Sequence, residues 1–425
     1  PKEWKKQEVI LFLERTKPTD IYIDGTLVSS SNDISTPQMH RLGKLKPGRH
    51  HLMIMVDNGS RVPEQIYSSS HAYTEDTQTN WNGIIGEIYL QEGEMRKATR
   101  PISVLPCFRE FHIEGKHFYA DGHETFLRGK HDACVWPLTG HVPMDTLSWK
   151  KYLNTCKEYG INHIRFHSWC PPEAAFAVAD ELGIYLQPEL PFWGDFNAKD
   201  SVLMTFLHKE GENILRTYSH HPSFVMLSLG NELWGSIDEM AKFVSDFRKI
   251  APDKLYTFGS NYYLGYQGVK PGMDYFTTCR TGGEAWGKYN THTRGSFSFA
   301  DAYDGGILNH FRPNSSMTLD EGCALSSVPV ISHETGQFQT YPDYAEITKY
   351  TGVLYPYNLE VFRERLKEAG MGDQAEAFHR ASGAWSAQLY KADIELDLRT
   401  RNMAGFQLLD IQDYPGQGSA YIGIL

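Results

Sequence analysis

The chain has 425 residues, of which 41% are hydrophobic and 22% charged, and its formal net charge is −11. This length predicts two domains, one of which can be as large as a barrel of about 250 residues. The composition excludes collagen-like repeats and low-complexity disorder. The acidic balance disfavours nonspecific nucleic-acid binding, and no apolar run approaches the ~18 residues of a membrane span.

The cysteines are scattered and have no spacing typical of a zinc site. Six in 425 residues do not make a disulfide scaffold, so buried free thiols are expected. They are Cys107, Cys134, Cys156, Cys170, Cys279 and Cys323. The chain opens with Pro1, Lys2, Glu3 and Trp4, which is no signal-peptide pattern, and it can begin inside a domain.

The first hundred residues have the pattern of a β domain. Residues 19–28 form an apolar run broken by a turn at Asp24 and Gly25. Residues 52–56 alternate in period two before a turn, and residues 82–90 resemble a closing strand. Several short strands with frequent turns predict a β-sandwich of jelly-roll type.

Beyond residue 110 two hairpin turns are followed by strands that alternate with helices. Helices are expected at 148–159, 171–182 and 202–218, and another begins at Ser236 with Glu239 completing a capping box. The eight expected strands are 125–128, 162–166, 184–186, 224–229, 255–258, 275–278, 328–332 and 406–409. Because no Gly-rich phosphate loop opens any helix, a (β/α)8 TIM barrel is favoured over an open doubly wound sheet.

Two carboxylates follow barrel strands at the end where barrel enzymes hold their chemistry. Glu232 ends the fourth strand in Leu229-Gly-Asn-Glu, and Glu334 ends the seventh in Ile331-Ser-His-Glu. Two facing carboxylates suit cleavage of a glycosidic bond, where one must be protonated and the other ionised. Their mutual repulsion raises one pKa, so one of them stays an acid near neutral pH.

The segment HPSFVMLSLGNE, which ends at Glu232, resembles the strand-four signature of glycoside hydrolase family 2. The resemblance covers nearly the whole chain and implies a jelly-roll sugar-binding domain, an immunoglobulin-like domain and a catalytic barrel. It implies that Glu232 is the general acid/base, that Asn231 holds the sugar 2-hydroxyl and that Glu334 is the nucleophile of a retaining mechanism.

Further residues match the family's strand-end positions. The resemblance implies that His131 and Asp132 contact the sugar and that Arg165 supports the nucleophile, since a guanidinium keeps a carboxylate ionised. Glu189 matches the Glu of the third strand. The family implies no organic cofactor. Pro191 stands where magnesium-binding members have a histidine, so no metal is expected.

Other candidates depart from the family pattern or line the expected mouth of the barrel. Ser168 stands where the family has a histidine, and His167 is expected to replace it as a substrate contact. Indole rings can stack on the C–H face of a sugar. The remaining substrate-binding candidates are Trp169, Trp193, Trp234, His333, Asp410 and Asp413, with Trp136 and Trp286 near the same mouth, whereas Trp149 is expected in the core.

The domain boundaries follow from these patterns. Residues 1–105 are expected to form the β-sandwich and residues 106–425 the barrel, each incomplete at its outer end. Only about twenty residues separate the last strand of the sandwich from the first hairpin of the barrel, whereas an immunoglobulin-like domain needs ~100. That middle domain is therefore expected to be absent.

The favoured activity is hydrolysis of a terminal equatorial glycoside, with a β-D-galactoside first. The alternatives in the same family are β-glucuronides, β-galacturonides, β-mannosides and α-L-arabinopyranosides; Arg280 or Lys130 can pair with a uronic acid. A noncatalytic carbohydrate-binding protein also remains open. So does a metal-dependent hydrolase that uses His131, His167 and His333. A carbohydrate is the expected partner, a homo-oligomer is possible, and family habit favours a periplasmic or secreted location.

Overall fold

The computed structural model describes residues 3–59, 61–74, 81–93, 110–136, 138–282, 291–294 and 314–411. The predicted boundary at 105/106, Asp413 and Trp286 lie outside these residues. None of the helices in the described ranges combines the length and the apolar content that crossing a membrane requires. The described cysteines, all but Cys107, are buried free thiols, as the sequence predicted.

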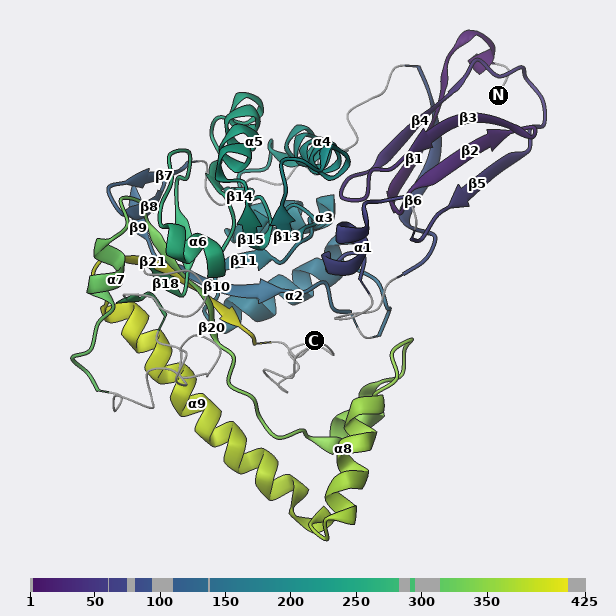
Figure 1. Cartoon of the computed structure of the whole chain (residues 1–425). Helices are drawn as coiled ribbons and strands as arrows, with labels where there is room; N and C mark the ends of the chain where they lie inside the picture. Colours follow the sequence, from purple (N-terminus) through teal and green to yellow (C-terminus); the bar gives the residue numbers. More distant parts are fainter. Residues whose placement is uncertain are drawn as a thin grey trace.

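Two three-stranded antiparallel sheets make up the N-terminal part (Figure 1). Their strands are β1 (Val9–Thr16), β4 (Gln38–Gly43) and β6 (Ile84–Glu92) in one sheet, and β2 (Thr19–Ile23), β3 (Thr26–Ser31) and β5 (Leu52–Val56) in the other. Leu11 and Leu13 of β1 share an apolar core with Ile21 and Ile23 of β2, so the two sheets pack face to face. The predicted turn at Asp24 joins β2 to β3, whereas β1 and β4 were not predicted.

A third antiparallel sheet, with shorter strands, follows segment 94–109, which lies outside the described residues. Its strands are β7 (Phe111–Glu114), β8 (His117–Ala120) and β9 (His123–Thr125). Phe118 of this sheet packs in one cluster with Leu127, Met226 and Ile331, which lie at or near the starts of three parallel strands. The small sheet therefore covers the amino-terminal ends of those strands.

Parallel strands form the centre of the larger part. Six of them make one sheet in the order β12 (Tyr185–Pro188), β11 (His163–Phe166), β10 (Leu127–Asp132), β21 (Met403–Leu409), β20 (Val330–Gly336) and β17 (Phe276–Thr278). β14 (Met226–Ser228) pairs in parallel with β16 (Leu255–Thr257). Isolated parallel bridges join Leu186 to Phe224, Glu189 to Ser228 and Ser260 to Thr277. All eight predicted strands are present, with boundaries that differ by a few residues.

Helices connect these strands on the outside. Those predicted are α2 (Thr146–Glu158), α3 (Glu173–Leu182), α4 (Ser201–Tyr218) and α5 (Ile237–Ile250). The hydroxyl of Ser236 accepts a hydrogen bond from the amide of Glu239 at 3.2 Å, so the predicted start of α5 is confirmed. Trp149 is fully buried on the inner face of α2, as predicted.

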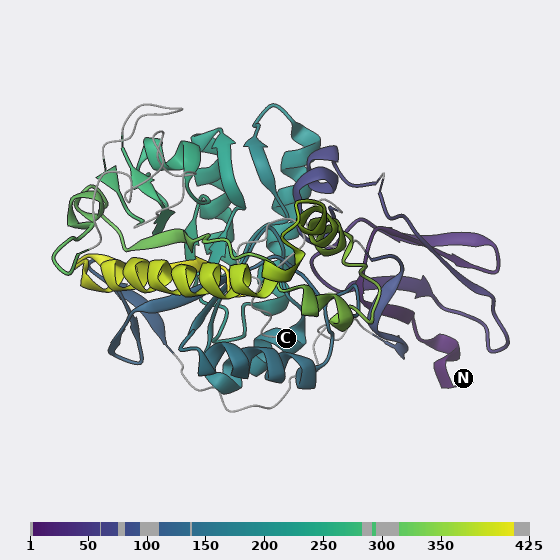
Figure 2. The same ribbon diagram turned by 90° about the horizontal axis from the view of Figure 1, so that it is seen from below.

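Five α-helices within the described residues were not predicted. They are α1 (Glu64–Ser69), α6 (Tyr262–Gln267), α7 (Asp320–Ala324), α8 (Tyr357–Glu368) and α9 (Ala375–Arg399). In Figure 1, α8 and the first half of α9 project away from the sheets, and Figure 2 shows α9 running across one side of the molecule. Along the chain, the α8–α9 hairpin connects β20 to β21. Only the later part of α9 buries several of its side chains.

Polar contacts join the N-terminal sheets to the parallel-strand part. The guanidinium of Arg15 donates to the backbone carbonyl of Cys170 at 2.9 Å. The carboxylate of Glu210 on α4 accepts hydrogen bonds from the amides of Ile34 and Ser35 at 3.2 and 3.0 Å. Because these groups are buried, the N-terminal segment is held against the strand ends that carry the candidate site.

Candidate active site

The two candidate catalytic carboxylates lie together in the structure. Glu232 is on β15 (Asn231–Gly235), just beyond β14, and Glu334 is on β20. Oxygens of these carboxylates and a ring nitrogen of His333 all lie within 4.8 Å of one another. Glu232 and Glu334 have positive φ angles of 40° and 47°. The left-handed region is costly for residues with a Cβ and is found mostly where surrounding structure enforces it, as at functional sites.

Arg165 connects the pair to its surroundings. This buried guanidinium donates to Oε1 of Glu334 at 3.0 Å, to Oε1 of Glu189 at 2.7 Å and to Oδ1 of Asn231 at 2.5 Å. The contact between Arg165 and Glu334 is the one that the family resemblance implies. Burial alone would lower the Arg165 pKa, but the two carboxylates raise it, so the arginine stays charged.

Glu232 has a different environment from Glu334. Burial, and then the charge of Glu334, raises the pKa of Glu232 to about 8. Its Oε1 accepts a hydrogen bond from Nδ2 of Asn261 at 3.3 Å, whereas Glu334 receives Arg165 on one oxygen and Nε2 of Gln337 on the other at 3.2 Å. Thus Glu232 is held protonated near neutral pH, whereas Glu334 accepts hydrogen bonds from Arg165 and Gln337.

Predicted residues of the first strand form a buried polar layer. His131 and Asp132 end β10. Nδ1 of His131 is 3.3 Å from Oδ2 of Asp410, and Asp132 accepts the hydroxyl of Tyr152 at 2.6 Å. Lys130 is 3.5 Å from Asp410, so its charge is matched inside the protein. Asp132 and Asp410 therefore bind His131, Lys130 and Tyr152 in one buried polar layer.

Histidines gather around Glu334. Nε2 of His167 and of His333 lie 4.0 and 3.6 Å from Oε1 of Glu334. Burial lowers the pKa of His131, His167 and His333 well below the usual range, so these imidazoles are neutral. His167 therefore lies beside Glu334, and its expected contact with substrate stays a prediction.

The tryptophans divide into two groups. Trp193 and Trp234, on the paired strands β13 (Trp193–Phe196) and β15, are 38% and 39% exposed, and the Trp193 ring lies 5.2 Å from that of His167. Trp169 is fully buried and donates its indole N–H to the carbonyl of Asp132 at 3.0 Å. The structure thus corrects the prediction for Trp169, whose ring packs in the core and presents no open face to a sugar. Trp136 is partly buried against the same core.

Three residues of the site were missed by sequence reasoning. His71, from the loop after α1, places its ring 4.1 Å from that of His167, and its amide donates to Oγ of Ser168 at 3.0 Å. Asn261 follows β16 and contacts Glu232. Arg294 donates to the carbonyls of His333 and Glu334 at 2.9 and 2.6 Å. His71 and Arg294 lie in segments with no strand-end motif, so no local signal points to them.

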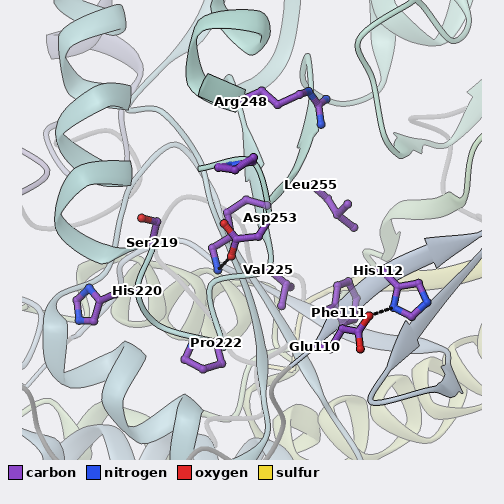
Figure 3. Close-up of a pocket in the computed structure, with 12 residues that line it drawn as sticks. Glu110, Phe111, His112, Ser219, His220, Pro222, Val225, Arg248, Asp253 and Leu255 are labelled. Carbon is purple, nitrogen blue, oxygen red and sulfur yellow. Dashed lines mark ion pairs between the residues drawn. The ribbon is translucent and has the colours of Figure 1, made fainter. Parts of the chain in front are cut away.

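A cavity of about 570 Å³ lies at the other end of the parallel strands (Figure 3). Val225, which precedes β14, and Leu255, which begins β16, line it together with Phe111 of the small sheet. Because Glu232 follows the opposite end of β14, this cavity is not part of the candidate active site.

Comparisons with known proteins agree with this architecture. No family model matches the chain. A protein of Formosa agariphila described as "Putative beta-glucuronidase" is 25% identical over 142 residues, which is 32% of this chain but only 17% of that relative's length.

Solved structures match over most of the chain. A β-galacturonidase of glycoside hydrolase family 2 from Eisenbergiella tayi, bound to galacturonate, has a TM-score of 0.57 and 14% identity, covering 95% of this chain and 80% of that one. The β-glucuronidase of Ruminococcus gnavus has a TM-score of 0.60 and 14% identity, with coverages of 97% and 80%. That of Dictyoglomus thermophilum has a TM-score of 0.60 and 12% identity, with coverages of 97% and 82%. The resemblance to glycoside hydrolase family 2 is therefore confirmed at the level of the fold.

Proposed function

We propose that the chain is a retaining exo-glycoside hydrolase that acts on a terminal β-D-uronide. The observation that carries the proposal is the pair Glu232 and Glu334, whose oxygens lie within 4.8 Å in unlike environments. Retaining enzymes hold their carboxyl groups about 5–5.5 Å apart, whereas inverting enzymes need about 6.5–9.5 Å to admit a water molecule. The short separation supports attack by a carboxylate rather than by water.

In this mechanism Glu334 attacks the anomeric carbon. A bond forms between its carboxylate oxygen and the sugar, the glycosidic bond breaks, and protonated Glu232 gives its proton to the leaving oxygen. Glu232, now ionised, then takes a proton from water, whose oxygen displaces Glu334 from the sugar. Arg165 donates to Glu334 and holds its carboxylate in one orientation during both steps.

We also propose that the eight parallel strands form a (β/α)8 barrel in residues 106–425, with a jelly-roll domain in residues 1–105. The strand pairings and the isolated bridges support this arrangement, and so does the likeness to family 2 structures over most of the chain. In such a barrel, Glu232, Glu334 and Arg165 share the carboxyl-terminal end of the strands, where barrel enzymes bind substrates.

The choice of a uronide differs from the β-galactoside that the sequence favoured. The relatives reported above are described as glucuronidases and a galacturonidase, so the uronide alternative fits better. Of the two candidate cations, Lys130 is paired with Asp410. Arg280 on β18 (Arg280–Thr281) is buried, and it lies close enough to Glu232 for its charge to lower the pKa of that carboxyl. We therefore assign Arg280 to the substrate carboxylate.

The test is hydrolysis of 4-nitrophenyl glycosides by wild type, Glu334→Ala and Arg280→Met. The panel holds the β-glucuronide, β-galacturonide, β-galactoside, β-mannoside and α-L-arabinopyranoside. We expect release from a uronide, loss in Glu334→Ala and partial rescue by azide with inverted stereochemistry. Arg280→Met should lower kcat/KM for the uronide about 10–100-fold, because a hydrogen bond to a charged group contributes about 1.5–3 kcal/mol.

Other outcomes separate the alternatives. Release from the galactoside with silence on both uronides would restore the first sequence prediction. Silence across the panel from a folded protein that still binds oligosaccharides would favour the noncatalytic binding protein. Full activity in Glu334→Ala would refute the assigned nucleophile.

A further inference from the structure

Glu334 lies between imidazoles that come from different strands. One ligand atom each of His131, His167 and Glu334 lies within 4.8 Å of the others. Glu334 also belongs to a second set of this kind, with Glu232 and His333. Apart from Glu232, which is partly buried, all these residues are buried. The arrangement places up to four possible ligands around one carboxylate.

Imidazole nitrogen and carboxylate oxygen are ligands that suit Zn²⁺ and its neighbours in the first transition series. Mg²⁺ and Ca²⁺ prefer sites built from oxygen alone. The residues around Glu334 therefore select for a zinc-like ion over the alkaline-earth ions.

The histidines also have the supporting contacts that metal ligands usually have. Nδ1 of His131 is 3.3 Å from the carboxylate of Asp410, and Nδ1 of His167 is 3.0 Å from the hydroxyl of Ser168. Such contacts on one ring nitrogen fix the orientation of the ring and the tautomer that presents the other nitrogen to an ion. In His167 that other nitrogen, Nε2, faces Glu334 at 4.0 Å.

His333 gives independent support. Its side chain is fully buried, and neither ring nitrogen has a hydrogen-bond partner among the residues that the structure describes. Its Nε2 lies 3.6 Å from Oε1 of Glu334. A buried polar group without a partner costs about 1–3 kcal/mol, so this imidazole is available as a further ligand for an ion bound at Oε1 of Glu334.

We propose that Zn²⁺, or a divalent ion of the same class, binds Glu334 between His131 and His167 and blocks the carboxylate from attacking a substrate. Arg165 contacts the same oxygen of Glu334 and carries a like charge, so the ion has to share or displace this contact. Binding of the ion is therefore reversible, and the bound ion inhibits the site rather than stabilising the fold. Binding of the ion stands apart from the proposed function, whereas the inhibition rests on it.

A second cluster supplies the control. Glu173, His220 and His221 also present ligand atoms within 4.8 Å of one another. There, however, His221 is committed to an ion pair with Asp180 at 2.6 Å and with Glu173 at 3.1 Å. His220→Gln changes this cluster, which lies apart from Glu334, and should leave both zinc binding and hydrolysis unchanged.

The experiment titrates the full chain with ZnSO₄ by calorimetry and with CoCl₂ by visible absorption, which reports imidazole and carboxylate coordination. Wild type, His167→Gln, Glu334→Gln and His220→Gln are compared after circular dichroism has established that each is folded. We expect wild type to bind one ion per chain. The affinity for the ion should be lower by about tenfold or more in His167→Gln and in Glu334→Gln, since even outer contacts of metal ligands contribute about 10–100-fold. In wild type, zinc should inhibit hydrolysis in competition with the substrate and EDTA should reverse it.

The outcomes are distinguishable. No saturable binding up to millimolar zinc, or binding that is unchanged in both His167→Gln and Glu334→Gln, overturns the inference. So does binding that is lost in His220→Gln. If zinc binds at Glu334 but the protein hydrolyses no glycoside, the metal site stands and the proposed function fails. If the protein hydrolyses a uronide and zinc does not inhibit it, the proposed function stands and the inhibitory metal site fails.

Discussion

The raised pKa of Glu232 depends on Glu334 in a way that can be measured. Burial is the largest cause of the shift to about 8, and the charge of Glu334 is the next. With this pKa, about 90% of the Glu232 carboxyl is protonated at pH 7, compared with under 1% at the ordinary value of about 4.3. In the proposed mechanism, the proton that Glu232 gives to the leaving oxygen is therefore available near neutral pH and is lost as pH rises through about 8.

The substitution Glu334→Gln keeps the shape of the side chain and removes its charge. At a separation of 4.8 Å, the limit within which the two oxygens lie, Coulomb's law at an effective dielectric of about 20 gives about 3.5 kcal/mol, or about 2.5 pKa units. The charge centres are further apart than the nearest oxygens, and burial remains. We therefore expect the pKa of Glu232 to fall by about 1–2 units in this variant.

The assay is a ¹³C NMR titration of protein labelled at the glutamate carboxyl carbon. The resonance that disappears in Glu232→Gln is assigned to Glu232 and is followed in wild type and in Glu334→Gln. In wild type, kcat/KM should fall tenfold per pH unit above about 8. A wild-type midpoint near 4.5, or one that does not move in Glu334→Gln, would refute the reasoning.

Three further predictions concern the support of the site and the stability of the chain. Arg165→Met should lower the free energy of unfolding by about 3–5 kcal/mol in urea titrations, because it leaves Glu189 buried without its counter-charge; a loss below 1 kcal/mol would contradict this. Gly211→Ala on α4 should destabilise by about 1–3 kcal/mol, since the added Cβ overlaps a phenyl ring, whereas Gly383→Ala on α9 meets nothing within 4 Å and should stabilise by up to about 1 kcal/mol; equal changes in Tm would rule out the packing argument. Burial lowers the pKa of His221, but the carboxylates of Asp180 and Glu173 outweigh it and raise the pKa to about 9. The stability from this ion pair is present below about pH 6.5 and is lost as pH rises through about 9, so the difference in unfolding free energy between wild type and His221→Gln should shrink over that window.

The strands of the parallel sheet were predictable because their signal is local. Each is a short apolar run followed by a polar residue or a turn, and buried parallel strands need little else. The same reasoning identified Glu232 and Glu334, since a carboxylate directly after such a run has few structural reasons to be there. Their proximity followed from one topological fact, namely that parallel strands end at a common face.

Other features could not be predicted because their cause is not local. The α8–α9 hairpin has many exposed apolar side chains and a weak periodic pattern, so neither helix is evident from spacing. Strand β1 is buried along nearly its whole length, and its sequence VILFLERT has no alternation to mark it as a strand. Trp169 follows a strand, as an active-site residue would, yet its ring turns into the core.

The sequence by itself determined the order of the parallel strands along the chain, the two carboxylates and the arginine between them, because these depend on residue type and on position within one element. Only the tertiary structure decided what surrounds them. His71 reaches His167 from the N-terminal part, and Arg294 holds the backbone of Glu334 from a distant segment. The unlike environments of the two carboxyls, and the imidazole of His333 with no hydrogen-bond partner among the described residues, arise from burial and from the packing of segments that are separate in the sequence. Such contacts depend on how the whole chain packs, which no local pattern specifies.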